Sequence, residues 1–137
     1  MNQGHKRIAA VSLIVRADGL MLCVWNKRYN GWTMPGGKVE DGETVERGLR
    51  RELAEETDLT ADHVELVYAA PLVPGAYADR ASSVRVYRVA TLGGEPREAE
   101  PGCPVRWMTT DQFLELCPFS DFYRRMFDAG VDVSPTY

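Results

Sequence analysis

Apolar positions along the chain fall into short runs separated by polar or glycine-containing segments. The runs at 7–16, 20–25, 64–70, 83–92 and 105–108 are rich in β-branched residues or alternate between apolar and polar positions, which is typical of strands. An Ala-Asp-Gly turn joins the first two runs and predicts that they form a hairpin. The regular alternation in 83–92 predicts a strand with one face in solvent.

Helical spacing follows in the second quarter of the chain, where apolar residues recur every four positions at Val45, Leu49 and Leu53. This helix is expected to begin at residue 43 or 44 and to run to about residue 57. The polar segment 60–62 is expected to break the pattern. Before the helix, 27–37 is expected to be an irregular loop, because its proline lacks an N–H donor and its glycines free the backbone.

Two more helices are predicted near the end of the chain. One is capped by Thr109 or Thr110 and runs to Leu116, and the other covers 120–127. The order of elements predicts an α/β protein with a mixed sheet and helices packed on it. No linker divides the sequence, so residues 1–137 are expected to form a single domain. The segment 71–82 is expected to be a loop of the kind that covers ligands.

Composition and charge indicate the compartment of this domain and the kinds of partner it binds. The chain has no apolar run near the length of a membrane span, and its three cysteines are widely spaced, which indicates a reducing cytoplasm. Residues 38–58 hold eight acidic and four basic residues and so account for the whole net charge of −4. No basic run tracks a polymer backbone, so no nucleic-acid polymer and no membrane are expected as partners.

The acidic excess is concentrated at the end of the predicted helix, where Glu52, Glu55 and Glu56 fall on one side. Like charges at this spacing repel, and the C-terminal end of a helix disfavours negative charge further. A solvated helix face is the common explanation for acidic residues, but such a face usually alternates in sign. A bound divalent cation would offset the repulsion, so this turn is a candidate metal site.

The same residues belong to a longer pattern. Gly37, Glu43 and the run Arg51-Glu52-Leu53-x-Glu55-Glu56-x-Asp58-Leu59 resemble the Nudix box, G-x5-E-x7-R-E-U-x-E-E-x-G-U, where U is aliphatic. Eight of the nine defined positions match, and the exception is Asp58, where the family has glycine. The preceding Trp32-x-x-Pro35-Gly36-Gly37 is similar to the segment that leads into this box. Asp58 is expected in the left-handed conformation, which aspartate tolerates better than most residues.

The resemblance implies an α/β/α sandwich and a hydrolase of nucleoside diphosphates linked to another group, X, assisted by Mg²⁺ or Mn²⁺. It assigns metal binding to Glu55 and Glu56, a metal-ligand or general-base role to Glu52, and a further ligand to the backbone carbonyl of Gly36. A late glutamate, Glu98 or Glu100, is implied as an additional ligand or base. Arg51 is expected to orient the carboxylates, with Glu43 as its partner. Similar proteins are often homodimers, which extends that expectation to this chain.

Substrate contacts are predicted from residue type. Lys38 and Arg28 are candidates for the phosphates, and Trp32 and Tyr77 for stacking on a base or ring. The short chain favours a MutT-like activity that converts a nucleoside triphosphate to the monophosphate and pyrophosphate. The positions of Pro74 and Tyr77 after the box resemble ADP-ribose and dinucleoside polyphosphate hydrolases, and nucleotide sugars are a further alternative. A non-catalytic nucleotide sensor is the alternative of another class, and it rests on Asp58 alone.

Overall fold

Two sheets form the centre of the computed structural model, which describes residues 7–72 and 82–137. The first sheet has the order β4-β1-β6-β5, formed by Gly36–Lys38, Ile8–Leu13, Ser83–Thr91 and Ala61–Pro71. The second has the order β3-β2-β7, formed by Gly31–Thr33, Met21–Asn26 and Val105–Met108. β1 and β6 run parallel and the other pairs antiparallel, so the first sheet is mixed, as the sequence predicts.

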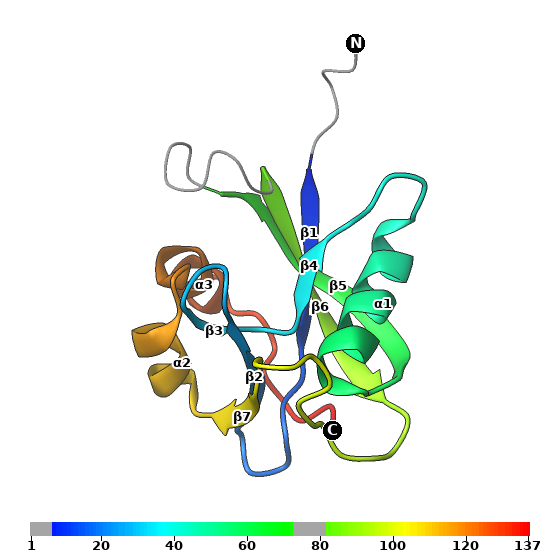
Figure 1. Ribbon diagram of the computed structural model, residues 1–137. Helices are drawn as coiled ribbons and strands as arrows, with labels where there is room; N and C mark the ends of the chain where they lie inside the picture. The colour runs from blue at the N-terminus through cyan, green and yellow to red at the C-terminus, as the bar shows by residue number, and fades with distance from the viewer. Residues whose placement is uncertain (1–6, 73–81) are drawn as a thin grey trace.

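One helix covers one side of the first sheet, and the other two helices lie with the second sheet on its other side (Figure 1). α1 (Val45–Thr57) packs against β1, β4 and β5. α2 (Thr110–Leu116) and α3 (Ser120–Asp128) lie beside the second sheet, on the opposite side of β1 from α1. This layering confirms the predicted α/β/α sandwich. In the described part of the chain, no helix has both the length and the apolar character needed to cross a bilayer.

β1 separates two apolar cores because its side chains alternate between the faces of the sheet. Ala10 and Ile14 pack with Leu49 and Leu53 of α1, and all four are fully buried. Val11, Leu13 and Val15 turn the other way, into the core shared with the second sheet and α3. The apolar stripe of α1 thus packs the helix on the sheet, and the acidic side of the helix remains available for other contacts.

The ends of α1 are set by its own sequence. Thr44 is the N-cap, and its side chain accepts a hydrogen bond from Arg47 N at 3.1 Å. The helix ends at Asp58, whose φ of 65° is in the left-handed region and whose N–H bonds to the carbonyl of Ala54. The carboxylate of Asp58 pairs with Arg97 at 2.8 Å. Aspartate therefore fills the position of the box glycine in the conformation predicted for it.

The predicted hairpin between 7–16 and 20–25 is wrong. β1 and β2 lie in different sheets, and only a single bridge, between Val15 and Met21, joins the two segments. Both edges of β1 are occupied by β4 and β6, so no edge remains for β2. The segment expected to be an irregular loop contributes the short strands β3 and β4, and β5 begins at Ala61, within the predicted break.

Candidate active site

The acidic end of α1 lies directly against the glycines of β4. Glu56 Oε1 accepts a hydrogen bond from the N–H of Gly36 at 2.7 Å. A Cβ placed on Gly37 would lie 2.5 Å from Glu52 Oε2, so only glycine lets the Glu52 carboxylate come this close to the strand. A Cβ on Gly36 would overlap the carbonyl oxygen of Ala10. Gly37 therefore provides the space into which the Glu52 carboxylate fits, and Gly36 lets β4 pack closely against β1.

Arg51 is the centre of an ion-pair network on the same helix. Its Nε and Nη2 donate to the two carboxylate oxygens of Glu43 at 2.7 and 3.0 Å, the fork geometry in which guanidinium binds carboxylate best. This confirms the predicted Arg51–Glu43 partnership. Arg51 Nη1 reaches Glu52 at 3.3 Å and Glu55 at 3.2 Å. Hydrogen bonds from Arg51 and from the backbone of Glu40 lower the pKa of Glu43 to about 2, so Glu43 stays ionised and holds Arg51 in place.

The carboxyl groups of Glu52 and Glu56 lie in a poorly solvated setting. Burial, followed by the charge of Glu52, raises the pKa of Glu56 to about 9, although the N–H of Gly36 opposes the shift. Burial also raises the pKa of Glu52, against the attraction of Arg51. The charge of Glu100 raises both pKa values, which marks it as a third acidic neighbour. A cation bound beside these groups would allow them to ionise together.

The donor chemistry fits a hard divalent cation, because Mg²⁺ and Mn²⁺ prefer carboxylate and carbonyl oxygens. The side-chain placement is less complete. Among residues 7–72 and 82–137, no three Asp, Glu, His or Cys side chains are grouped closely enough to hold an ion. Glu55 in particular is directed to Arg51 and is 56% exposed. Binding an ion would therefore require rotation of at least one glutamate side chain, on a backbone that already brings the carboxylates to one turn.

The loop between β6 and β7 carries the late glutamates and is tied to the end of α1. Backbone bonds join Arg97 N to Thr57 O at 3.0 Å and Ala99 N to Glu56 O at 3.4 Å. Glu98 accepts from Gly102 N at 2.9 Å and so serves its own loop. Glu100 raises the pKa of the α1 carboxylates, as described above. The structure thus favours Glu100 over Glu98 as the late acidic neighbour of the site.

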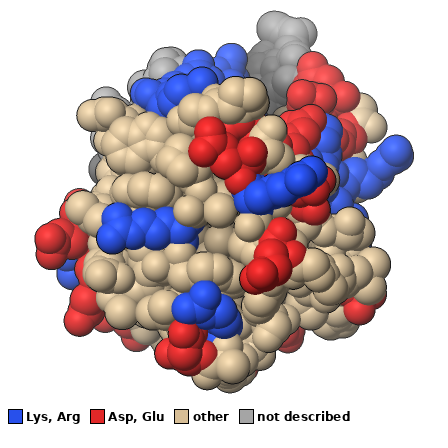
Figure 2. All heavy atoms as spheres, turned by 60° about the horizontal axis from the view of Figure 1, so that its bottom comes forward, with Lys and Arg blue, Asp and Glu red and all other residues tan. Residues whose placement is uncertain are grey.

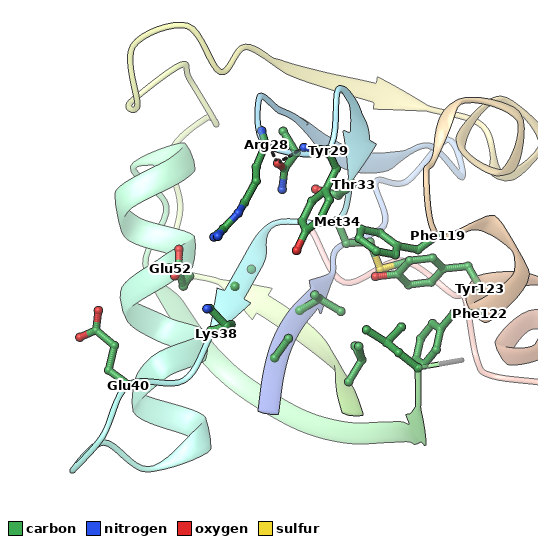
Figure 3. Close-up of a pocket in the computed structure, with 17 residues that line it drawn as sticks. Arg28, Tyr29, Thr33, Met34, Lys38, Glu40, Glu52, Phe119, Phe122 and Tyr123 are labelled. Atoms are coloured by element: carbon green, nitrogen blue, oxygen red, sulfur yellow. Dashed lines mark hydrogen bonds between the residues drawn. The ribbon is translucent and has the colours of Figure 1, made fainter. Parts of the chain in front are cut away.

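A cavity of about 340 Å³ opens beside these carboxylates. Figure 3 shows Arg28 and Lys38 pointing to the end at which Glu52 lies, and Phe119, Phe122 and Tyr123 gathered at the opposite end. The first end combines positive side chains with the acidic turn of α1. The second is built from α3 and the chain just before it, and there the Phe119 ring also meets Tyr29 edge-on with centroids 4.8 Å apart. The cavity therefore has a charged end and an aromatic end.

The predicted substrate residues divide into three groups. Arg28 and Lys38 line the cavity. Trp32 does not line it, because successive residues of β3 face opposite sides and Thr33 takes the cavity side. Trp32 instead packs edge-on against Trp25 at 5.6 Å, with the Arg106 guanidinium 5.8 Å from its ring centre, so its predicted stacking role is not supported by its position. Tyr77, like Pro74, lies outside the described residues.

Sequence reasoning missed five of the residues that line the cavity. These residues are Asn26, Thr33, Phe119, Phe122 and Tyr123. The three aromatic residues resemble ordinary core positions of a helix. Nothing in their spacing indicates that they share a cavity with β2, which lies nearly one hundred residues earlier in the sequence. Asn26 carried a usable signal, because asparagine just before a polar loop often bonds the backbone two or three residues on.

Charged side chains of both signs are mixed on one face of the molecule. On the face shown in Figure 2, Lys and Arg side chains lie in separate groups among Asp and Glu, and they form no continuous basic surface there. Binding of a long phosphate backbone depends on many such contacts in a row. This face offers isolated cations instead.

Comparison with known proteins identifies the motif and the fold. The NUDIX domain model matches residues 5–129. The chain belongs to the Nudix family. Members of this family are hydrolases that act on pyrophosphate bonds of nucleotide-type substrates and typically depend on a divalent metal, which confirms the family expected from the box.

Among its relatives is a MutT-like protein of Streptomyces ambofaciens, 30% identical over 110 residues, which cover 79% of this chain and 67% of that protein. A protein of Mycobacterium tuberculosis named putative 8-oxo-dGTP diphosphatase 2 is 42% identical over 85 residues, 62% of this chain and 58% of its own length. The matched part thus spans little more than half of that relative. A MutT NUDIX hydrolase structure from Burkholderia pseudomallei matches with a TM-score of 0.72 at 26% identity, covering 93% of this chain and 99% of the other.

Proposed function

We propose that the chain is a MutT-like pyrophosphohydrolase that cleaves a nucleoside triphosphate, ribo or deoxy, to the monophosphate and pyrophosphate with Mg²⁺ or Mn²⁺. The two-ended cavity carries this proposal. Arg28 and Lys38 lie at its charged end next to the carboxylates of α1, and its other end is aromatic. A nucleotide has the same two parts, a polyphosphate and a flat ring, so one molecule can fill both ends with its phosphates beside the acidic turn.

In this proposal the metal is held by oxygen atoms of Glu52, Glu55, Glu56 and the Gly36 carbonyl, with Glu100 or Glu98 as an additional ligand. The bound cation would neutralise phosphate oxygens and lower the pKa of a coordinated water. Arg28 and Lys38 bind and orient the phosphates. Arg51 acts as a positioning residue, because its bonds to Glu43 fix the guanidinium that meets Glu52 and Glu55.

The reaction balances as a hydrolysis. The water oxygen forms a bond to phosphorus, the bond between the α- and β-phosphates breaks, and pyrophosphate leaves. The proton of the water passes to a carboxylate, for which Glu52, Glu55 and Glu56 are the candidates. Glu55 already ion-pairs with Arg51, whereas Glu52 both lines the cavity and has a raised pKa, so Glu52 is best placed to receive the proton.

Other substrates are possible for the same chemistry. ADP-ribose, dinucleoside polyphosphates and nucleotide sugars share the diphosphate but need room for a second moiety. The name of the M. tuberculosis relative supports the triphosphate instead. The sensor alternative loses its main support, because Asp58 adopts the left-handed conformation without displacing the glutamates and its carboxylate is paired with Arg97.

The test is a panel of nucleoside triphosphates, ADP-ribose, a dinucleoside polyphosphate and a nucleotide sugar, each with Mg²⁺ and with phosphate and pyrophosphate measured separately. We expect pyrophosphate and monophosphate from triphosphates, and no product after chelation. Glu56→Gln should remove this turnover, whereas Glu46→Gln, on the exposed side of the same helix, should keep it. Release of phosphate alone, or cleavage of ADP-ribose in preference, would refute the triphosphate assignment. Nucleotide binding without any turnover would support the sensor.

A further inference from the structure

Residues 132–137 form no helix or strand, yet they are fixed to the centre of the first sheet. The N–H groups of Thr136 and Tyr137 both donate to the carbonyl of Val15, at 2.8 and 3.0 Å, just after the end of β1. Val15 N donates in return to Thr136 Oγ1 at 3.1 Å. Arg88 on β6 donates to two backbone carbonyls of the same segment, at 2.9 and 3.0 Å. The position of Tyr137 is therefore determined by β1 and β6.

The side chain of Tyr137 contacts the start of the loop 92–104 and the strand that follows this loop. Its hydroxyl donates to the carbonyl of Gly94 at 2.6 Å, just after the end of β6. Its ring lies against Trp107 of β7, with centroids 5.0 Å apart. Figure 1 shows the red end of the chain beside this yellow-green loop. One side chain thus restrains the loop near the point where it leaves the first sheet and near the point where it enters the second.

The middle of the same loop brings Glu100 to the acidic end of α1. The loop is joined to the helix by the bond from Arg97 N to Thr57 O at 3.0 Å and by that from Ala99 N to Glu56 O at 3.4 Å. The second bond is longer than usual and so holds the loop only weakly. Glu100 follows directly after it, and its charge acts on the α1 carboxyl groups, whose pKa values it raises. The position of Glu100 therefore depends on how the rest of the loop is restrained.

We propose that Tyr137 is a positioning residue that restrains this loop and thereby keeps Glu100 beside the carboxylates of α1. Tyr137 does not line the cavity, so it acts on the site through the loop and not by contact with a ligand. The loop needs such a restraint because it forms no helix or strand of its own. The consequence for metal binding rests on the proposed function, in which Glu100 is a candidate additional ligand, whereas the restraint on the loop does not.

Hydrogen exchange of backbone amides, followed by NMR in the metal-free protein, tests the restraint on the loop. Tyr137→Ala removes both the hydroxyl and the ring, so the amide of Arg97 should exchange roughly tenfold faster. Tyr137→Phe keeps the ring contact with Trp107 and should give a smaller increase. Val133→Ala is the matched control and should leave this exchange unchanged, because Val133 lies in the same segment and is 43% exposed. Unchanged exchange at Arg97 in Tyr137→Ala would overturn the proposal. An equal acceleration in β1 would also overturn it, because Tyr137 would then stabilise the whole fold.

Calorimetric titration with Mn²⁺, in the presence of a non-hydrolysable nucleoside triphosphate, tests the consequence for the site. We expect Tyr137→Ala to bind Mn²⁺ roughly tenfold more weakly than wild type. If Tyr137 acts through Glu100, the double variant with Glu100→Gln should bind Mn²⁺ no more weakly than Glu100→Gln alone. Undiminished affinity in Tyr137→Ala, or a further loss of similar size in the double variant, would overturn the proposal. Absence of Mn²⁺ binding in wild type would refute the proposed function instead, and hydrogen exchange would still decide whether Tyr137 restrains the loop.

Discussion

Glu56→Gln should make the metal-free protein less sensitive to alkaline pH. Burial and the charge of Glu52 raise the pKa of Glu56 from 4.5 to about 9 in the folded protein. The contribution of protonated Glu56 to the free energy of unfolding is fully present below pH 4.5. It declines as the pH rises from 4.5 and is lost once the pH passes the folded-state pKa of about 9. Each pH unit within this window costs about 1.4 kcal/mol, so wild type should lose about 3 kcal/mol between pH 5 and pH 7 through this one group.

The assay is urea unfolding in the presence of chelator at several pH values from 5 to 8, with the variant measured beside wild type. Glutamine keeps an oxygen for the N–H of Gly36 but has no proton to lose, so the stability of the variant relative to wild type should rise with pH. Glu55→Gln is the matched control, because Glu55 is 56% exposed and already paired with Arg51, and its difference from wild type should stay nearly constant. If the unfolding free energies of wild type and Glu56→Gln change in parallel with pH, the raised pKa of Glu56 is refuted.

Three further substitutions test how the site is held. Gly37→Ala places a Cβ 2.5 Å from Glu52 Oε2 and should displace that flexible carboxylate. We expect kcat to fall by tenfold or more, while the free energy of unfolding changes by only about 1 kcal/mol. A near-native kcat would show that the close approach of Glu52 to β4 is unimportant. Arg51→Lys loses the two-point contact with Glu43 and should lower kcat by roughly ten- to hundredfold at unchanged nucleotide binding, as single-turnover rates and calorimetry can establish. Asp58→Gly relieves a left-handed backbone conformation that costs about 1 kcal/mol, but it also removes the exposed ion pair with Arg97. Urea denaturation should therefore show a net change in stability below about 1 kcal/mol, and turnover should be retained. Loss of activity would tie Asp58 to catalysis.

Local patterns in the sequence were sufficient for the elements that local interactions determine. α1 begins after Thr44 and ends at Asp58 because cap residues and an apolar stripe specify it, and β7 and α2 were predicted within a residue for the same reason. The pairing of strands follows different physics. Whether β2 joins β1 depends on which partners already occupy the edges of β1, and those partners, β4 and β6, come from distant parts of the chain.

The site was predictable where it is contiguous. Arg51 and the α1 glutamates lie on one helix, so spacing alone brings them together. The cavity lining is not contiguous in sequence, since Asn26 and Tyr123 are separated by nearly a hundred residues and line one cavity only after the two sheets and α3 are assembled. Trp32 was predicted to stack on the substrate but does not line the cavity. A three-residue strand shows too little alternation of apolar and polar residues to reveal which side chain faces the cavity.

The most direct test of the site is a calorimetric titration with Mn²⁺, in the presence of a non-hydrolysable nucleoside triphosphate, of wild type, Glu56→Gln and the surface control Glu46→Gln. We expect saturable ion binding by wild type and Glu46→Gln, and at least tenfold weaker binding by Glu56→Gln. Absence of Mn²⁺ binding in wild type, or undiminished affinity in Glu56→Gln, would contradict the assignment of the acidic turn of α1 to a metal-bound diphosphate.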